Sequence, residues 1–126
     1  YLPVIMPMRF QPLLFAPFAS NMVLNRYGIP EPMVAAHARI SVKALDLLLV
    51  PLLAYDNHGA RVGFGAGYYD RTLAFLKYRR HWCKPRLIGL AYSFQHCAVL
   101  PKDSWDVRLP KIITEKKVIV TKVKSP

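Results

Sequence analysis

The chain of 126 residues has few cysteines and no clustered metal ligands. Its two cysteines, Cys83 and Cys97, lack the CxxC spacing of metal and redox motifs and are too few for a disulfide framework. We therefore expect both thiols to be reduced. The four histidines lie far apart in the sequence and form no HExxH or similar ligand set. A structural zinc site is not expected.

Acidic side chains are also scarce. Seven Asp and Glu residues stand against 18 Lys and Arg residues, which gives a net charge of +11. The surplus gathers in residues 71–86 and 108–124. Cations in the last turn of a helix account for part of it, because they interact favourably with the helix dipole. The remainder predicts a polyanionic partner, such as a nucleic acid, a nucleotide or a polycarboxylate ligand.

Long apolar runs are absent from the sequence. The longest, residues 47–55, is too short to span a bilayer and is interrupted by Pro51. Residues 8–20 resemble a signal peptide superficially, but two prolines break the apolar stretch. We therefore expect a cytoplasmic location. The chain begins with Tyr1 rather than Met, which suggests a fragment, a processed form or an unrecorded start.

The length and composition of the chain predict a single domain over residues 1–126, and the order of its expected elements predicts the α/β class. Apolar residues make up 53% of the chain, and a chain of this length buries roughly two-thirds of its unfolded surface. Residues 1–5 are expected to form a short strand. Residues 8–34 are rich in proline and predict loop or short extended pieces. Residues 46–50 have no polar alternation, which favours a parallel strand covered on both faces.

The second half of the chain alternates helix and strand patterns. Residues 68–80 predict a helix whose buried stripe is formed by Tyr69, Thr72, Leu73, Leu76 and Arg80. Another buried strand is expected at residues 86–92, a short helical turn within 94–101, and a last strand at 111–120. This order predicts a layered α/β sandwich with a mostly parallel sheet flanked by helices.

Residues 63–71, GFGAGYYDR, contain half of the six glycines of the chain. Glycines allow backbone N–H groups to approach a phosphate, and a following helix adds further free N–H groups. No GK[ST] follows, and Tyr68 stands where a dinucleotide motif has its third glycine. From the glycines alone, a tight turn and a phosphate-binding loop are equally good interpretations.

The neighbours of these glycines favour the phosphate. Arg61 could grip phosphate oxygens through its guanidinium group. Asp70 could be a magnesium ligand beside a phosphate, or simply a favourable acid in the first turn of a helix. Tyr68 and Tyr69 could both be core aromatics, although one of them could stack on a flat ligand.

Several longer segments carry a resemblance to a known family. They are "DLLLVPLLAYDNHGARVGFGAGYYDRTLAF", "IGLAYSFQ", "LPKDSWDVRL" and "IITE", preceded in the same order by "YLPV" and "GIPEP". Together they resemble the 5-formyltetrahydrofolate cyclo-ligase (methenyltetrahydrofolate synthetase) family across essentially the whole chain. The central motif, R-x-G-x-G-x-G-Y-Y-D, is far more specific than its glycines.

The resemblance implies a cytoplasmic ligase of one-carbon metabolism. Such an enzyme uses Mg-ATP to convert 5-formyltetrahydrofolate, possibly polyglutamylated, to 5,10-methenyltetrahydrofolate, with release of ADP and phosphate. By resemblance, Arg61 and Tyr68 are catalytic, and Asp70 and Asp106 bind Mg²⁺. The nucleotide would contact Arg61, Val62, Gly63, Phe64, Gly65, Ala66, Gly67, Tyr68 and Tyr69. The folate would contact Phe64, Gly65, Ala66, Gly67 and Tyr68.

Two departures from the family pattern leave alternatives open. The family has a segment before its "YLPV" landmark that contacts both substrates, and here Pro110 replaces an acidic residue before the "TE" strand. An inactive, truncated member that retains only nucleotide or folate binding is therefore one alternative. A nucleic-acid-binding module is another, because Tyr78 and Trp82 lie among Lys77, Arg79 and Arg80. No nucleic-acid motif supports it, so nucleic acid and membrane partners are not expected.

Overall fold

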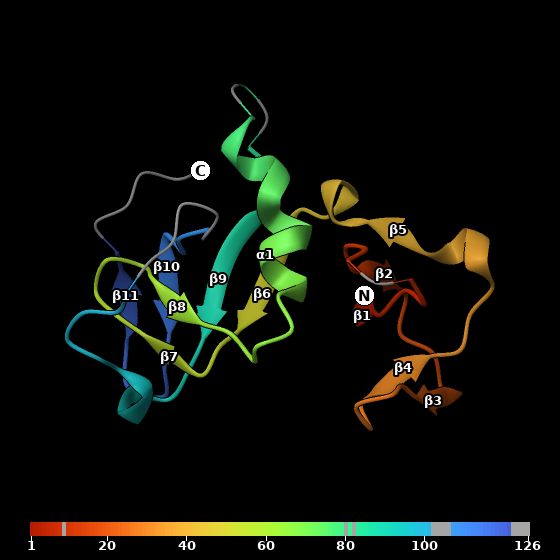
Figure 1. Cartoon of the computed structure of the whole chain (residues 1–126), viewed down its shortest axis with the longest axis horizontal. Helices are drawn as coiled ribbons and strands as arrows, with labels where there is room; N and C mark the ends of the chain where they lie inside the picture. The colour runs from red at the N-terminus through yellow and green to blue at the C-terminus, as the bar shows by residue number, and fades with distance from the viewer. Residues whose placement is uncertain (9, 80, 82, 102–106, 122–126) are drawn as a thin grey trace.

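The structure is a computed structural model that describes residues 1–8, 10–79, 81, 83–101 and 107–121. Its C-terminal part is built on a four-stranded sheet with the order β11-β10-β9-β6 (Figure 1). Strand β6 (Leu47–Pro51) pairs in parallel with β9 (Arg86–Leu90), which pairs in parallel with β10 (Lys111–Ile113). Strand β11 (Val118–Val120) returns antiparallel to β10.

One face of this sheet forms the core. Helix α1 (Tyr68–Leu73) continues as the 3₁₀ helix η3 (Ala74–Lys77), and its Leu73 and Leu76 are buried with Leu48, Val50 and Leu87 of the sheet. The opposite face is open in the described residues: Leu47 and Leu49 are both 49% exposed. The prediction that residues 46–50 are covered on both faces is therefore wrong. Successive strand side chains point to opposite faces, and only one face is covered by described residues.

A hairpin leads from the sheet to the helix. Strand β7 (Ala54–Tyr55) pairs with β8 (Arg61–Val62) across a turn in which Gly59 has a φ of 81°. The buried Asp56 carboxylate accepts the backbone N–H groups of His58, Ala60 and Leu100. Burial acts to raise the pKa of this carboxyl, but the three donors outweigh it and hold the pKa below its usual value. This turn fixes the start of β8 and, through it, Arg61.

The described part of the N-terminal region, residues 1–45, contains short strands, which agrees with the strand predicted within residues 1–5 and the extended pieces predicted within residues 8–34. Strands β1 (Leu2–Val4), β2 (Leu14–Ala16) and β5 (Ile40–Ser41) form an antiparallel sheet, and β3 (Met22–Leu24) pairs with β4 (Pro30–Pro32). Two 3₁₀ turns flank β5: η1 (Ala36–Ala38) precedes it and η2 (Val42–Ala44) follows it.

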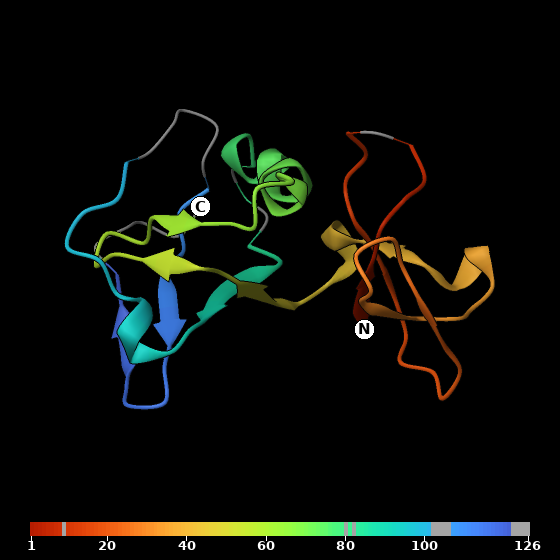
Figure 2. The ribbon, with the colours of Figure 1, turned by 60° about the horizontal axis from the view of Figure 1, so that its bottom comes forward.

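Helix α1 lies between this region and the four-stranded sheet in both views (Figures 1 and 2). The backbone N–H of Leu13 donates to Thr72 Oγ1 on the helix at 2.8 Å. Leu13, Phe15 and Val42 also belong to the same core cluster as the sheet. The N-terminal region is therefore held against helix α1, which directly follows the glycines of residues 63–67.

The predicted fold class is correct as α/β and needs correction in detail. The four-stranded sheet is mixed and the other sheets are antiparallel, where a mostly parallel sheet was predicted. The α-helix has six residues, with η3 replacing its predicted continuation. Residues 111–120 form two strands rather than one, because Thr114 and Lys117 close a turn between them through a 2.9 Å backbone hydrogen bond. The helical turn expected within 94–101 is η4 (Ser93–Gln95). Among the described residues, no helix has the length and apolar character needed to cross a membrane.

Candidate functional site

The glycine loop, defined here as residues 63–67, connects β8 to α1 and is exposed at Phe64, Gly65 and Ala66. Gly65 has a φ of 95° and Gly67 a φ of 73°, conformations that residues with a Cβ rarely adopt. A Cβ built on Gly65 would meet no atom within 4 Å. The space above the middle of the loop is therefore open to a ligand. Since α1 is only six residues long, its dipole adds little.

Arg61 lies at the Gly63 end of the loop. Its side chain is only 4% exposed, and Nη2 donates to Asp70 Oδ1 at 3.1 Å. The guanidinium carbon lies 5.8 Å from the centroid of the Tyr69 ring. A Cβ on Gly63 would come within 3.0 Å of Arg61 Nη1. The buried Nε of Arg61 has no hydrogen-bond partner within the described residues. The structure thus brings Arg61, Tyr69 and Asp70 together under one end of the loop.

The structure adds a third interpretation of Asp70, as the ion-pair partner of a buried arginine. Its side chain remains 32% exposed, so the carboxylate is also accessible from outside. Carboxylate oxygen is the donor type that Mg²⁺ prefers, and one or two carboxylates with phosphate oxygens complete many magnesium sites. Asp70 therefore fits the predicted ion. The second predicted ligand, Asp106, lies outside the described residues. Within those described, no three His, Cys, Asp or Glu side chains cluster closely enough to hold a metal.

The two consecutive tyrosines have different surroundings. Tyr69 packs against the core beside Arg61, and its burial raises the pKa of its phenol. Tyr68 faces the N-terminal region, where its ring meets the Tyr27 ring edge-on at 6.1 Å between centroids. Its hydroxyl accepts a hydrogen bond from Arg26 Nη2. Interaction with Tyr27, and then with Arg26 and Arg71, holds the pKa of Tyr68 below its usual value. Both tyrosines are partly buried against the core, and they differ in the charged and aromatic groups around their hydroxyls.

Three residues at the Gly67 end were not singled out from the sequence: Arg26, Tyr27 and Arg71. Arg71 Nη1 donates to the carbonyl of Ala66 at 2.8 Å, and a Cβ on Gly67 would come within 2.9 Å of the same nitrogen. The position of Arg71, four residues after Gly67, places it one helical turn away and could have indicated this contact. Nothing in the sequence indicates that Arg26 reaches Tyr68, since 42 positions separate them.

Comparison with known proteins identifies the family of this chain. Residues 1–115 match the 5-formyltetrahydrofolate cyclo-ligase family. The chain belongs to this family. It is 38% identical over 122 residues to the 5-formyltetrahydrofolate cyclo-ligase of Escherichia coli K12, an alignment that covers 94% of this chain and 64% of the relative. The Haemophilus influenzae enzyme of the same name is 38% identical over 117 residues, with 90% of this chain and 59% of the relative covered.

Solved structures agree with this membership in the family. The NMR structure of 5,10-methenyltetrahydrofolate synthetase from Aquifex aeolicus matches with a TM-score of 0.68 and 32% identity, covering 90% of this chain and 55% of that one. The synthetase from Mycoplasma pneumoniae matches with a TM-score of 0.56 and 28% identity, covering 88% and 52%. The chain therefore spans between about half and two-thirds of the length of these cyclo-ligase relatives.

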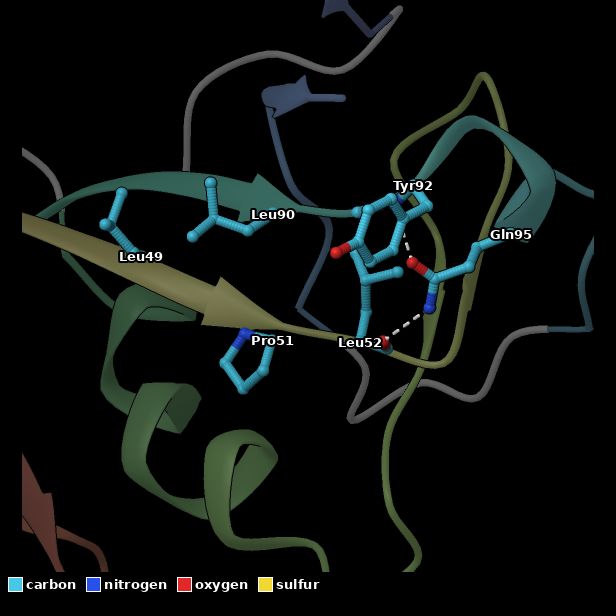
Figure 3. Close-up of a pocket in the computed structure, with 7 residues that line it drawn as sticks. Leu49, Pro51, Leu52, Leu90, Tyr92 and Gln95 are labelled. Carbon is cyan, nitrogen blue, oxygen red and sulfur yellow. Dashed lines mark hydrogen bonds between the residues drawn. The ribbon is translucent and has the colours of Figure 1, made fainter. Parts of the chain in front are cut away.

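An apolar hollow lies apart from the predicted residues, where strands β6 and β9 end (Figure 3). It is lined by Leu49, Pro51, Leu52, Leu90, Ala91, Tyr92 and Gln95. The Gln95 amide donates to the carbonyl groups of Leu52 and Leu53 at 3.0 Å, and its oxygen accepts the N–H of Tyr92 at 2.7 Å. Gln95 thus ties together the loops that follow the two strands. The hollow has no charged lining residue and none of the predicted ligand contacts.

The residues behind the nucleic-acid alternative are only partly described. Tyr78 is 84% exposed, and Arg79 donates to the carbonyl of Pro85 at 3.3 Å. Arg80 and Trp82 lie outside the described residues. Tyr78 is therefore accessible, but one of the cations beside it has a structural hydrogen bond to the residue that precedes β9.

Proposed function

We propose that this protein catalyses the ATP- and Mg²⁺-dependent cyclisation of 5-formyltetrahydrofolate to 5,10-methenyltetrahydrofolate, with release of ADP and phosphate. The observation that carries the proposal is the glycine loop with a buried arginine and an accessible carboxylate at its Gly63 end, in a chain that belongs to the cyclo-ligase family. The proposed substrates are ATP and a folate, both small anionic molecules, which suit a chain of net charge +11.

The chemistry explains the need for ATP. The oxygen of the formyl group is a very poor leaving group. Transfer of the γ-phosphoryl group to that oxygen converts it into a good one, and the neighbouring folate nitrogen then attacks the formyl carbon and closes the ring. Inorganic phosphate leaves with the former formyl oxygen. The protein's contribution to such a phosphoryl transfer is mainly positioning and charge stabilisation.

The residues of the loop divide this task. Residues 62–69 would hold the nucleotide, with the exposed middle of the loop, Phe64 to Ala66, shared with the folate. The N–H groups of the loop and the Arg61 guanidinium would bind phosphate oxygens, and Tyr68, at the end of the loop, would contact the folate and the reacting groups. Because Arg61 is fixed by Asp70 and Tyr69, it needs no rearrangement when phosphate arrives.

Asp70 and Asp106 would hold the magnesium ion, which would neutralise phosphate charge when bound. Asp70 has the exposure that this role requires. Its own part is to balance Arg61 and to keep one guanidinium edge turned toward Gly63.

A direct test is formation of the methenyl product by this chain, supplied with 5-formyltetrahydrofolate and Mg-ATP. Product above the ATP-free control supports the proposal. A folded chain that binds ATP or the folate but forms no product would instead support an inactive member that retains binding.

A further inference from the structure

A second group of cationic and aromatic side chains surrounds Tyr68 at the Gly67 end of the glycine loop. We call it the Tyr68 cluster; it consists of Phe10, Arg26, Tyr27, Tyr68 and Arg71. Arg26 Nη2 donates to the Tyr68 hydroxyl. The guanidinium carbon of Arg71 lies 4.9 Å from the centroid of the Tyr68 ring and 5.7 Å from that of Phe10. Two guanidinium groups from distant parts of the chain therefore converge on one side chain.

The described residues provide no ion pair that balances the charge of this cluster. Among the described residues, the ion pairs are Arg61–Asp70 and Lys84–Asp46, so neither Arg26 nor Arg71 has a carboxylate partner. The buried Nε of Arg71 is also without a hydrogen-bond partner there. Two cations beside one phenol repel each other unless an anion joins them. A guanidinium group binds carboxylate and phosphate with the same two-pronged geometry.

The cluster is held in place beside the loop. Arg71 is fixed by its hydrogen bond to the Ala66 carbonyl. The Tyr68 carbonyl accepts Thr72 Oγ1 at 2.6 Å, and Thr72 in turn accepts the N–H of Leu13. The position of Arg71 is therefore set by the same residues that shape the glycine loop, and an anion there would lie next to any ligand bound on the loop.

We propose that Arg26 and Arg71 form an anion subsite at the Gly67 end of the glycine loop, which takes a carboxylate or phosphate group of the ligand bound there. The inference deepens the proposed function and rests on it for the ligand. Two sources of the anion are possible: the glutamate carboxylates of the folate and the phosphates of ATP. Arg61 and Asp70 lie at the opposite end of the loop and Tyr68, Tyr27 and Phe10 at this one, which favours the carboxylate.

The test measures dissociation constants by calorimetry for the wild type, Arg26→Gln and Arg26→Lys. The matched control is Arg86→Gln, which neutralises an exposed arginine at the start of β9. The ligands are 5-formyltetrahydrofolate, the corresponding pteroic acid amide, which has neither glutamate nor a free carboxylate, ATP, and inorganic tripolyphosphate. Loss of one charged hydrogen-bond partner predicts roughly a tenfold rise in the dissociation constant of 5-formyltetrahydrofolate for Arg26→Gln. A smaller rise is expected for Arg26→Lys, which keeps the charge, and none for the control.

The arms separate the two sources. If the carboxylate occupies the subsite, Arg26→Gln weakens the binding of 5-formyltetrahydrofolate and leaves the binding of the pteroic acid amide and of ATP unchanged. If a phosphate occupies the subsite, Arg26→Gln weakens the binding of ATP and tripolyphosphate instead. Wild-type affinities of Arg26→Gln for all four ligands would overturn the subsite, as would an equal loss in Arg86→Gln.

Failure of the proposed function has a different signature. A wild type that binds a ligand but forms no product leaves the four-ligand comparison intact, and that comparison still decides the subsite. The other case is a wild type that binds neither 5-formyltetrahydrofolate nor ATP. The subsite is in that case decided by tripolyphosphate and by tri-γ-glutamate, which carry the two anionic groups alone. Weaker binding of either anion by Arg26→Gln supports the subsite. Equal binding, or none to the wild type, rejects it.

Discussion

The two ends of the glycine loop each place an arginine beside a glycine, but they balance its charge differently. At the Gly63 end, Arg61 is 4% exposed and paired with Asp70. At the Gly67 end, Arg71 lies between aromatic rings and donates to the Ala66 carbonyl, with no carboxylate partner among the described residues. A buried guanidinium group needs a fixed partner because its charge is removed from water, whereas a half-buried one is still partly solvated and can be paired by a ligand.

The comparison predicts that the paired end matters most for turnover. Arg61→Met removes the buried guanidinium and leaves the Asp70 carboxylate without its partner. We expect kcat/KM for ATP to fall roughly 100- to 1000-fold, the usual loss when one donor to a developing negative charge is removed. Steady-state formation of the methenyl product measures it, with Arg86→Met as the control. A variant within threefold of the wild type would show that Arg61 only supports the structure.

Asp70→Asn is expected to cause a smaller loss of activity, which should depend on the magnesium concentration. The amide keeps an oxygen that can accept Arg61 Nη2 but loses the charge that balances the guanidinium, so the free energy of unfolding should fall by roughly 1–3 kcal/mol. The negative charge toward Mg²⁺ is lost, and we expect the magnesium concentration for half-maximal rate to rise at least roughly tenfold. Titration of the rate with MgCl₂ and a urea denaturation curve test the two parts. An unchanged magnesium response would restrict Asp70 to the ion pair.

The middle and the Gly67 end of the loop should respond differently to an added methyl group. Both Gly65→Ala and Gly67→Ala force a Cβ into a positive-φ conformation, at a cost of roughly 1–2 kcal/mol in the free energy of unfolding. Only Gly67→Ala also displaces the Arg71 guanidinium, from which its Cβ would be 2.9 Å away. We therefore expect Gly67→Ala to be the less stable variant.

Binding should reverse that order. The Cβ of Gly65 would project into the open space above the loop. Gly65→Ala should therefore weaken ATP binding more than Gly67→Ala does, and Gly65→Val should weaken it further. Thermal melts and calorimetric ATP titrations of the variants provide the two rankings. Tight ATP binding by Gly65→Val would mean that the loop is only a turn.

The sequence predicted the parts of this site that are close together along the chain. Arg61, the glycines, Tyr68 and Asp70 form one motif, although the ion pair between Arg61 and Asp70 was not predicted. The Arg26–Tyr68 contact joins residues 42 positions apart, so no local spacing could indicate it. The same limit explains the sheet. The apolar run of residues 47–50 shows that both faces of β6 are apolar, but the element that covers each face depends on the tertiary fold.

Hairpins are also difficult to detect when their turn is polar and brief. Residues 111–120 read as one strand because Ile112, Ile113, Val118 and Ile119 are all apolar. The break lies in the turn after Thr114, whose hydroxyl accepts the N–H groups of Lys116 and Lys117. Threonine hydroxyls form such turns weakly and often, which makes them poor signals in a sequence.

The smallest expected effect is a difference between the consecutive tyrosines in alkaline titration. The pKa of Tyr68 is lowered by interaction with Tyr27 and with the two arginines of the cluster, and the pKa of Tyr69 is raised by burial. In the ultraviolet absorbance of phenolate, Tyr68→Phe should remove a group that ionises early, and Tyr69→Phe one that ionises late. The reverse order would remove the electrostatic distinction between the two ends.

Stability should follow the same two shifts with opposite signs. A raised pKa in the folded state means that the contribution of Tyr69 is complete below its unfolded pKa of about 10, and is lost as pH rises through the folded pKa. The contribution of Tyr68 is complete above that unfolded pKa, and is lost as pH falls through its lowered folded pKa. Urea denaturation across the alkaline range should therefore show a shallower decline of stability for Tyr69→Phe than for the wild type, and a steeper one for Tyr68→Phe. Equal slopes in the two variants would mean that the cations around Tyr68 are screened by solvent, and that the Gly67 end is electrostatically no different from the rest of the surface.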